Sequence, residues 1–261
     1  MEFALYLLLG AAAGVLAGLF GVGGGLIIVP VLVLSFSAQG FAPEILTHLA
    51  VGTSLATIVF TSSNSIREHQ RRGAVLWGLF RWLTPGILIG AAIGGLTAAL
   101  LQGPVLQKII GVFAICMAIQ LALNLTPTST RPLPKIPELI AAGSIIGWAS
   151  AIFGIGGGSL TVPFLVWRSI PIQKAVATSA ACGFPIALAG AIIFMVTGWN
   201  EPQLPQWSLG FVYLPALLGI ALTSVFFARF GAKLAHQLSP LLLKRLFAVL
   251  LVTVGLSFLL N

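Results

Sequence analysis

The chain has 261 residues, of which 58% are hydrophobic and only 7% are charged. A water-soluble domain carries about 25% charged residues, so this composition excludes soluble enzymes, nucleic-acid-binding domains and disordered tails as descriptions of the whole chain. The net charge of +8 in so apolar a chain indicates basic loops held on the cytoplasmic side of a membrane, not contact with nucleic acid. We therefore expect a multi-pass protein of the cell inner membrane, surrounded by the lipid bilayer.

The first uncharged stretch is too long for one straight membrane span. It lies between Glu2 and Glu44 and holds 41 residues, which as a helix would extend about 62 Å, twice the roughly 30 Å of a hydrocarbon core. Its segment FGVGGGLIIVP at 20–30 is rich in glycine, which disfavours helix by about 1 kcal/mol per residue. We predict a helical hairpin at 3–36, re-entrant or fully crossing, with the glycines at or near its tip.

Six ordinary spans are expected in addition to this hairpin. Apolar runs of about 20 residues are long enough to cross a membrane as helices. They lie at 45–64, 76–99 and 105–124, and, after a second glycine-interrupted stretch at 138–167, at 173–196, 208–229 and 240–260. A segment rich in Pro and Thr at 126–137 separates the two series and predicts an exposed linker.

The second series of segments repeats the first. FGVGGGLIIVP at 20–30 recurs as FGIGGGSLTVP at 153–163, and AVGTS at 50–54 recurs as AVATS at 175–179, in the same order. The chain is therefore predicted to be an internal duplication. The second glycine stretch then forms a hairpin like the first.

Loop charges indicate how the two copies are oriented. The loop at 65–75 carries three arginines, while its counterpart at 197–207 carries only Glu201. The positive-inside rule then places equivalent loops on opposite faces of the membrane. An arrangement of eight plain spans would leave these loop charges unexplained.

The predicted fold is therefore an all-α integral membrane protein of two inverted repeats. Each repeat has a glycine-tipped re-entrant or crossing helical hairpin and three transmembrane helices. The repeats lie at 1–125 and 138–261, the linker at 126–137 is cytoplasmic, and both termini lie outside.

The glycine tips are the first candidate site. Irregular backbone within a membrane persists only where it is buried in protein or lines an aqueous cavity. A helix that begins after such a tip presents unpaired N–H groups and a partial positive charge, and two such ends meeting near the midplane would bind an anion. The residues concerned are Gly23, Gly24, Gly25, Gly156, Gly157, Gly158 and Ser159. The alternative is that the glycines only permit close helix packing.

Paired hydroxyl residues are the second candidate. Thr53 and Ser54 lie about nine residues into a predicted span, and Thr178 and Ser179 lie similarly in its copy. Their hydroxyls can donate hydrogen bonds to a buried oxyanion, or they can bond a carbonyl of their own helix. Cys182 lies on the same helical face as Ser179 and is expected to be a small core residue, not a reactive thiol.

Other features point to no cofactor. Glu44 and His48 are one helical turn apart and could relay protons, or could form a plain interfacial pair. The two cysteines lie in apolar runs without clustered ligands, which predicts neither a metal site nor a disulfide framework. The string GVGGG is not a dinucleotide loop, because no strand precedes it and the chain has no Asp.

The glycine pair FGVGGGLIIVP and FGIGGGSLTVP, the AVGTS and AVATS pair, and HQRRGAVLWGLFRWLTPG at 69–86 resemble the TauE/SafE family, the sulfite exporters and their relatives. The resemblance covers nearly the whole chain. It implies an inner-membrane carrier of sulfur-containing anions such as sulfite, sulfoacetate or thiosulfate.

Together these features predict a secondary transporter, an exporter of small sulfur-containing anions that works by alternating access as a monomer or homodimer. A negative cell interior favours anion efflux by about 2.3 kcal/mol per charge per 100 mV, which predicts electrogenic facilitated efflux, with proton coupling through His48 as the alternative. Two other function classes remain open. One is an intramembrane serine hydrolase that uses Ser159 with His48, and the other is a non-transporting scaffold.

Overall fold

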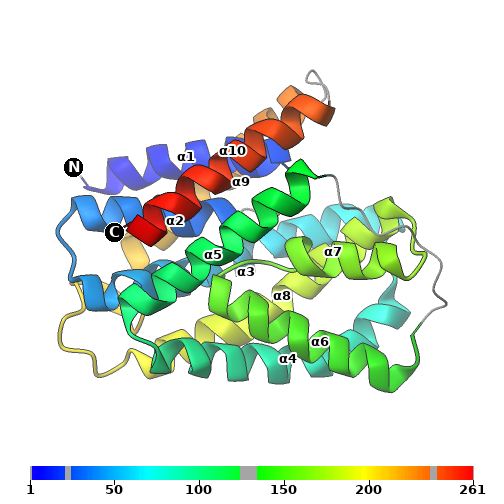
Figure 1. Cartoon of the computed structure of the whole chain (residues 1–261), viewed down its shortest axis with the longest axis horizontal. Coiled ribbons are helices and arrows are strands. Elements are labelled where there is room, and N and C mark those ends of the chain that lie inside the picture. Colours follow the sequence, from blue (N-terminus) through cyan, green and yellow to red (C-terminus); the bar gives the residue numbers. More distant parts are fainter. Residues whose placement is uncertain (1, 21–24, 124–133, 236–239, 261) are drawn as a thin grey trace.

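The computed structural model of the chain describes residues 2–20, 25–123, 134–235 and 240–260 (Figure 1). Within these ranges the chain forms ten α-helices and one small two-stranded sheet. The helices are α1 (Glu2–Phe20), α2 (Gly25–Ala38), α3 (Pro43–Arg71), α4 (Trp77–Leu100), α5 (Gly103–Ala122), α6 (Ile136–Phe153), α7 (Gly158–Trp167), α8 (Ile172–Thr197), α9 (Leu214–Ala235) and α10 (Pro240–Leu260). The strands β1 (Ser208–Leu209) and β2 (Val212–Tyr213) directly precede α9.

The helix positions confirm the predicted all-α membrane fold. Five helices, namely α3, α4, α5, α6 and α8, are long and apolar enough to cross a membrane. In each predicted hairpin the structure places two helices, α1 with α2 and α6 with α7, separated at the glycine-rich segment. The inverted relation of the two repeats remains a prediction.

The start of α9 differs from the predicted span at 208–229. Residues 208–213 form an antiparallel hairpin in which Ser208 is paired with Tyr213 and Leu209 with Val212. Gly210 turns this hairpin at a φ of +54°, and the N–H of Phe211 donates to the carbonyl of Phe194 at 3.0 Å, which holds the turn against the end of α8. The apolar run did not reveal this turn, because its residues are as hydrophobic as the helix that follows.

Helices from the first and second parts of the chain interleave. α1 packs along α9, α4 packs along α6, α3 packs along α8, and α5 packs along α10. The α4–α6 pair lies so close that a Cβ placed on Gly90 would come within 2.0 Å of the carbonyl oxygen of Ser144. Small residues allow this approach, as they do in many membrane helix pairs.

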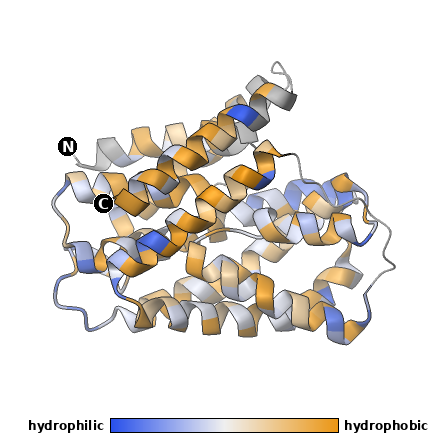
Figure 2. Ribbon diagram, in the orientation of Figure 1, coloured by the Kyte–Doolittle hydropathy of each residue, from blue (hydrophilic) through white to orange (hydrophobic). Residues whose placement is uncertain are grey.

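Most helices run between two ends of the molecule where hydrophilic residues gather, and hydrophobic residues dominate between these ends (Figure 2). One end holds the turns α3–α4 and α7–α8 (Figure 1). We call it the arginine face, because Arg71, Arg72 and Arg168 lie in or next to these turns. The start of α1, the end of α10 and the turns α2–α3 and α4–α5 lie at the opposite end, the terminal face (Figure 1). In the most apolar part of α3, 83% of the residues are buried, compared with 28% in α5, so α3 is a central helix and α5 a peripheral one.

Candidate functional site

The second glycine motif forms a buried turn between α6 and α7. Gly154 ends α6 with a φ of 63° and a ψ of 31°, the left-handed conformation that favours glycine. The next N–H, that of Ile155, donates to the carbonyl of Ser150 at 3.0 Å. Residues 154–157 are all buried, and α7 begins at Gly158. The chain therefore turns inside the protein at this motif, as predicted.

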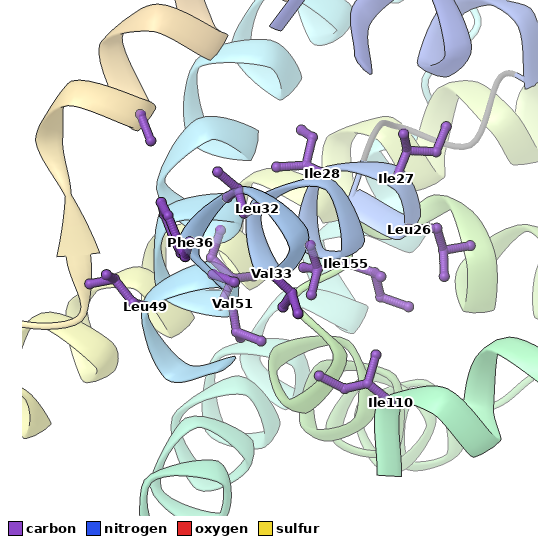
Figure 3. Close-up of a cluster of buried hydrophobic side chains, with 14 of the residues drawn as sticks. Leu26, Ile27, Ile28, Leu32, Val33, Phe36, Leu49, Val51, Ile110 and Ile155 are labelled. Carbon is purple, nitrogen blue, oxygen red and sulfur yellow. The ribbon is translucent and has the colours of Figure 1, made fainter. Parts of the chain in front are cut away.

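The second glycine turn lies against the start of α2. A Cβ on Gly25 would come within 2.7 Å of the Cα of Ile155 and 2.8 Å of the carbonyl oxygen of Gly154. Around this contact Leu26 and Ile28 of α2, Val51 of α3 and Ile155 gather in one apolar cluster (Figure 3). The predicted site residues Gly23 and Gly24 lie outside the described residues.

Close packing accounts for part of the second motif. A Cβ on Gly157 would come within 2.5 Å of the carbonyl oxygen of Ser179 in α8, so only glycine lets the start of α7 approach α8 in this way. Gly156 is less constrained, since its nearest neighbour would be a methyl of Ile58 at 3.5 Å. The packing interpretation thus holds for Gly157, and it does not exclude a second role for the first-turn N–H groups of α7.

The four predicted hydroxyls are buried, and each has a partner within the protein. Thr53 accepts from the N–H of Tyr213 at 2.9 Å, and Thr178 accepts from the N–H of Leu76 at 3.0 Å. The two threonines thus hold the segments that lead into α9 and α4. Ser54 donates to the carbonyl of Gly154 at 2.9 Å, and Ser179 donates to the carbonyl of Val176 at 3.0 Å. Three of these four bonds reach a different element, and only that of Ser179 stays within its own helix.

Unpartnered buried hydroxyls flank the same turn. Ser159, in the first turn of α7, is 5% exposed, and its Oγ has no hydrogen-bond partner among the described residues. The same holds for Ser150 near the end of α6 and for Thr161 in α7, both 0% exposed. No side chain caps the start of α7, so its first N–H groups lack a side-chain acceptor.

Sequence reasoning included Ser159 and missed Ser150 and Thr161. Aligning the two glycine motifs would have indicated these two residues. The positions equivalent to Ser150, Ser159 and Thr161 in the first copy are Ala17, Leu26 and Ile28. Hydroxyls therefore occur only in the second copy, a difference that marks one side of the turn as polar.

Comparison with known proteins agrees with this architecture. The sequence model of the sulfite exporter TauE/SafE family matches residues 6–258. The chain belongs to the TauE/SafE family. Its relatives are named as membrane transporters, and it is therefore a membrane transporter.

Two relatives match along nearly their whole length. A probable membrane transporter protein of Haemophilus influenzae is 40% identical over 259 residues, which cover 98% of each chain. One of Methanocaldococcus jannaschii is 30% identical over 261 residues, covering 98% of this chain and 95% of the relative. YunE of Bacillus subtilis, also a probable membrane transporter protein, is 28% identical over 223 residues, covering 76% and 80%. No solved structure matches the transporter.

The transporter does not pair His48 with Glu44. Glu44 is exposed at the start of α3, whereas His48 is 4% exposed and its Nε2 lies 3.0 Å from the carbonyl oxygen of Ala98 at the end of α4. The interfacial-pair interpretation is therefore wrong. Ser159 has no imidazole partner either, so the nucleophile–base contact that a serine hydrolase needs is absent from the described residues.

The arginine face carries exposed charges at the end of α3. Arg72 donates to the carboxylate of Glu68 at 2.7 Å. This hydrogen bond, together with the positive charge of Arg72, lowers the pKa of Glu68. Partial burial, followed by the charge of Arg72, lowers the pKa of the neighbouring His69. These groups form a solvated basic patch, which is typical of a cytoplasmic loop.

Proposed function

We propose that the transporter moves small sulfur-containing anions, such as sulfite, sulfoacetate or thiosulfate, out of the cell by alternating access. One observation carries the proposal. The start of α7 lies in the interior of the protein without a side-chain cap, and the hydroxyl of Ser159 beside it is buried with no partner in the part of the chain that the structure describes. The helix N–H groups and the Ser159 hydroxyl can all donate hydrogen bonds, which suits an anion that must shed its water.

Alternating access requires two parts that move against one another. We propose that 1–125 and 138–261 are inverted repeats that supply these parts, linked through cytoplasmic residues 126–137. The exchanged helix pairs support this proposal, since the first helix of each half packs on the fourth helix of the other, α1 on α9 and α6 on α4. A two-fold relation between the halves would produce both pairs.

The loop charges and the apolar helices also suggest in which membrane, and in which orientation, the transporter lies. We propose that it lies in the inner membrane as a monomer or homodimer, with the arginine face in the cytoplasm and both termini outside. The negative interior of the cell drives anion efflux through such a carrier by about 2.3 kcal/mol per charge per 100 mV.

Flux through proteoliposomes of the purified protein tests the proposal. Labelled sulfite, thiosulfate and sulfoacetate are each compared with sulfate, at an imposed potential and with the proton gradient collapsed by a protonophore. We expect at least one sulfur anion to move in the direction that the potential favours. If none of them moves without a partner protein, the transporter does not work in this way.

Replacing Ser159 tests the site itself. Ser159→Ala removes one hydroxyl donor to a charged group, worth about 1.5–3 kcal/mol, so KM should rise by roughly 10-fold to 150-fold. Ser224→Ala is the matched control, because Ser224 in α9 is also 5% exposed with an unpartnered hydroxyl. Equal effects of the two substitutions on KM would remove Ser159 from the site.

A further inference from the structure

His48 is unusual among the ionisable side chains of the transporter. Among the acidic and basic side chains whose burial the structure describes, only that of His48 is buried, at 4% exposed. An ionisable group inside a membrane protein is costly, and such residues usually serve a function. The equivalent position in the second copy is Gln173, which is exposed, so the repeat itself does not require an imidazole here.

The hydrogen bonds of His48 are those of a neutral ring. A carbonyl only accepts, so Nε2 carries the hydrogen that is donated to Ala98 across 3.0 Å. Nδ1 is buried and has no partner among the described residues. A second proton on Nδ1 would create a buried charge and a donor without an acceptor, which is unfavourable while the ring stays in place.

The ring of His48 supports the β1–β2 hairpin. It stacks on Phe211 with the ring centroids 5.1 Å apart and the planes at 29°, and it also lies near Phe194 of α8. Phe211 is two residues before Tyr213, whose N–H is held by Thr53. A change at His48 therefore acts on the β1–β2 hairpin and, through it, on a hydroxyl near the second glycine turn.

The β1–β2 hairpin is part of a barrier at the terminal face. The ring of Tyr213 packs edge-on against Tyr6, Phe36 and Phe41, with centroid distances of 5.6–5.7 Å. Tyr6 and Phe36 are 0% exposed. These aromatic rings pack α1, α2 and β2 together, so a solute could pass between these elements only if the hairpin moved.

Few other charges face His48. Its own helix carries Glu44 one turn earlier, α5 carries Lys108 next to Gln107, which bonds Thr47, and the segment after α8 carries Glu201. α4 and α8 carry charges only near their opposite ends, at Arg81 and Lys174. Glu44, Lys108 and Glu201 are therefore the groups whose titration or charge has to be separated from that of His48.

We infer that His48 is a proton site that controls the barrier at the terminal face. With a neutral ring, the stack on Phe211 keeps the β1–β2 hairpin closed. A proton taken up from water at Nδ1 breaks the stack, because the charged ring must turn toward water or toward the carboxylate of Glu44. The hairpin then opens and releases Thr53. This inference rests on the proposed transport function for its purpose, but its test requires no transport.

Thiol labelling of Val212→Cys measures the opening of the hairpin directly. Val212 is 0% exposed, and the background carries Cys116→Ala and Cys182→Ala so that no other thiol reacts. The protein is placed in lipid nanodiscs, where a soluble maleimide reaches both faces. Asn200→Cys, an exposed position before the same hairpin, is labelled in parallel, and the ratio of the two rates cancels the intrinsic pH dependence of thiol reactivity.

The expected result is a rise of about tenfold or more in this ratio between about pH 8 and about pH 5.5, since one coupled protonation gives up to tenfold per pH unit. His48→Gln, which keeps an amide donor for Ala98 but lacks the ring and the second proton site, should give a ratio that does not change with pH. Glu44→Gln and Glu201→Gln should keep the response. The inference is overturned if the ratio does not change with pH, if His48→Gln responds like the parent protein, or if either glutamate variant alone abolishes the response.

A folding defect in His48→Gln is controlled by a second variant. His48→Phe keeps an aromatic ring against Phe211 and cannot take up a proton, so it should show a low ratio that does not vary with pH. If the protein with His48 in place shows the labelling response but moves no anion in proteoliposomes, the proposed transport function is contradicted and His48 is still a proton site. The reverse outcome would contradict only the proton site.

Discussion

The bond between Thr53 and the β1–β2 hairpin makes a quantitative prediction about stability. Thr53→Val keeps the shape of the side chain and removes the acceptor of the Tyr213 N–H. Thr53 is 0% exposed and the bond is buried, so the N–H loses its partner where water does not reach it. An unsatisfied buried polar group costs about 1–3 kcal/mol, and we expect the free energy of unfolding to fall by that amount.

Thr57→Val is the matched control for this substitution. Thr57 lies one turn further along α3, is also 0% exposed, and donates to the carbonyl of Thr53 in its own helix at 2.8 Å. That carbonyl is the ordinary acceptor in the helix and keeps its backbone donor when the hydroxyl is lost. Thr57→Val should therefore change the free energy of unfolding by no more than about 0.5 kcal/mol.

Reversible unfolding in mixed micelles, followed by circular dichroism as the fraction of denaturing detergent rises, gives both values. Thr178→Val should fall between the two, because the Leu76 N–H that it would free is only partly buried. The reasoning fails if Thr57→Val destabilises the protein as much as Thr53→Val, since the loss would then come from the hydroxyl and not from an abandoned N–H.

Three further predictions concern other parts of the molecule. Ser54→Ala should lower the free energy of unfolding by about 1 kcal/mol in the same assay, because it removes the donor to Gly154 at 2.9 Å; no change would mean that the bond contributes nothing. Gly90→Ala should prevent folding, since its Cβ would lie 2.0 Å from the Ser144 carbonyl oxygen. Gly78→Ala, whose Cβ would meet nothing within 4 Å, should be neutral or stabilising. Size-exclusion profiles of the purified variants distinguish the two, and equal behaviour would contradict the close approach of α4 and α6. Arg72 lowers the pKa of both Glu68 and His69, so Arg72→Gln should raise both values in NMR titrations. Unchanged titrations would refute the effect of Arg72. The lowered pKa of His69 also means that the folded state favours the neutral ring. The free energy of unfolding should therefore fall as the pH drops from the ordinary pKa of histidine toward the lower pKa of His69 in the folded protein.

Much of the fold could be predicted from charge spacing and glycine. Charges bound the apolar runs that became α3, α4, α5 and α8, and the glycine-rich segment at 153–163 turned where its helix propensity is lowest. The hairpin at 208–213 could not be predicted from hydropathy, because its pairing and its contact with Phe194 depend on the packed structure.

The partners of the candidate site residues were harder to predict. A hydroxyl in a span has a carbonyl of its own helix within reach, and the sequence does not show whether Thr53 instead meets Tyr213 from a segment 160 residues away. The same holds for His48, which is buried because the end of α4 and the β1–β2 hairpin close over it. Such contacts depend on how helices that are distant in the sequence pack together, and the pattern of residues within one helix does not predict them.

The exchanged pairing of α1 with α9 and α6 with α4 has a consequence for biogenesis. Membrane helices leave the ribosome in order, and α1 has to wait in the lipid until nearly the whole chain has been synthesised before α9 arrives. Neither half alone would present a complete partner surface, so separately expressed halves should be held by quality control unless both are made together. The two predicted repeats would then form one folding unit that requires both halves of the chain, not two modules joined end to end.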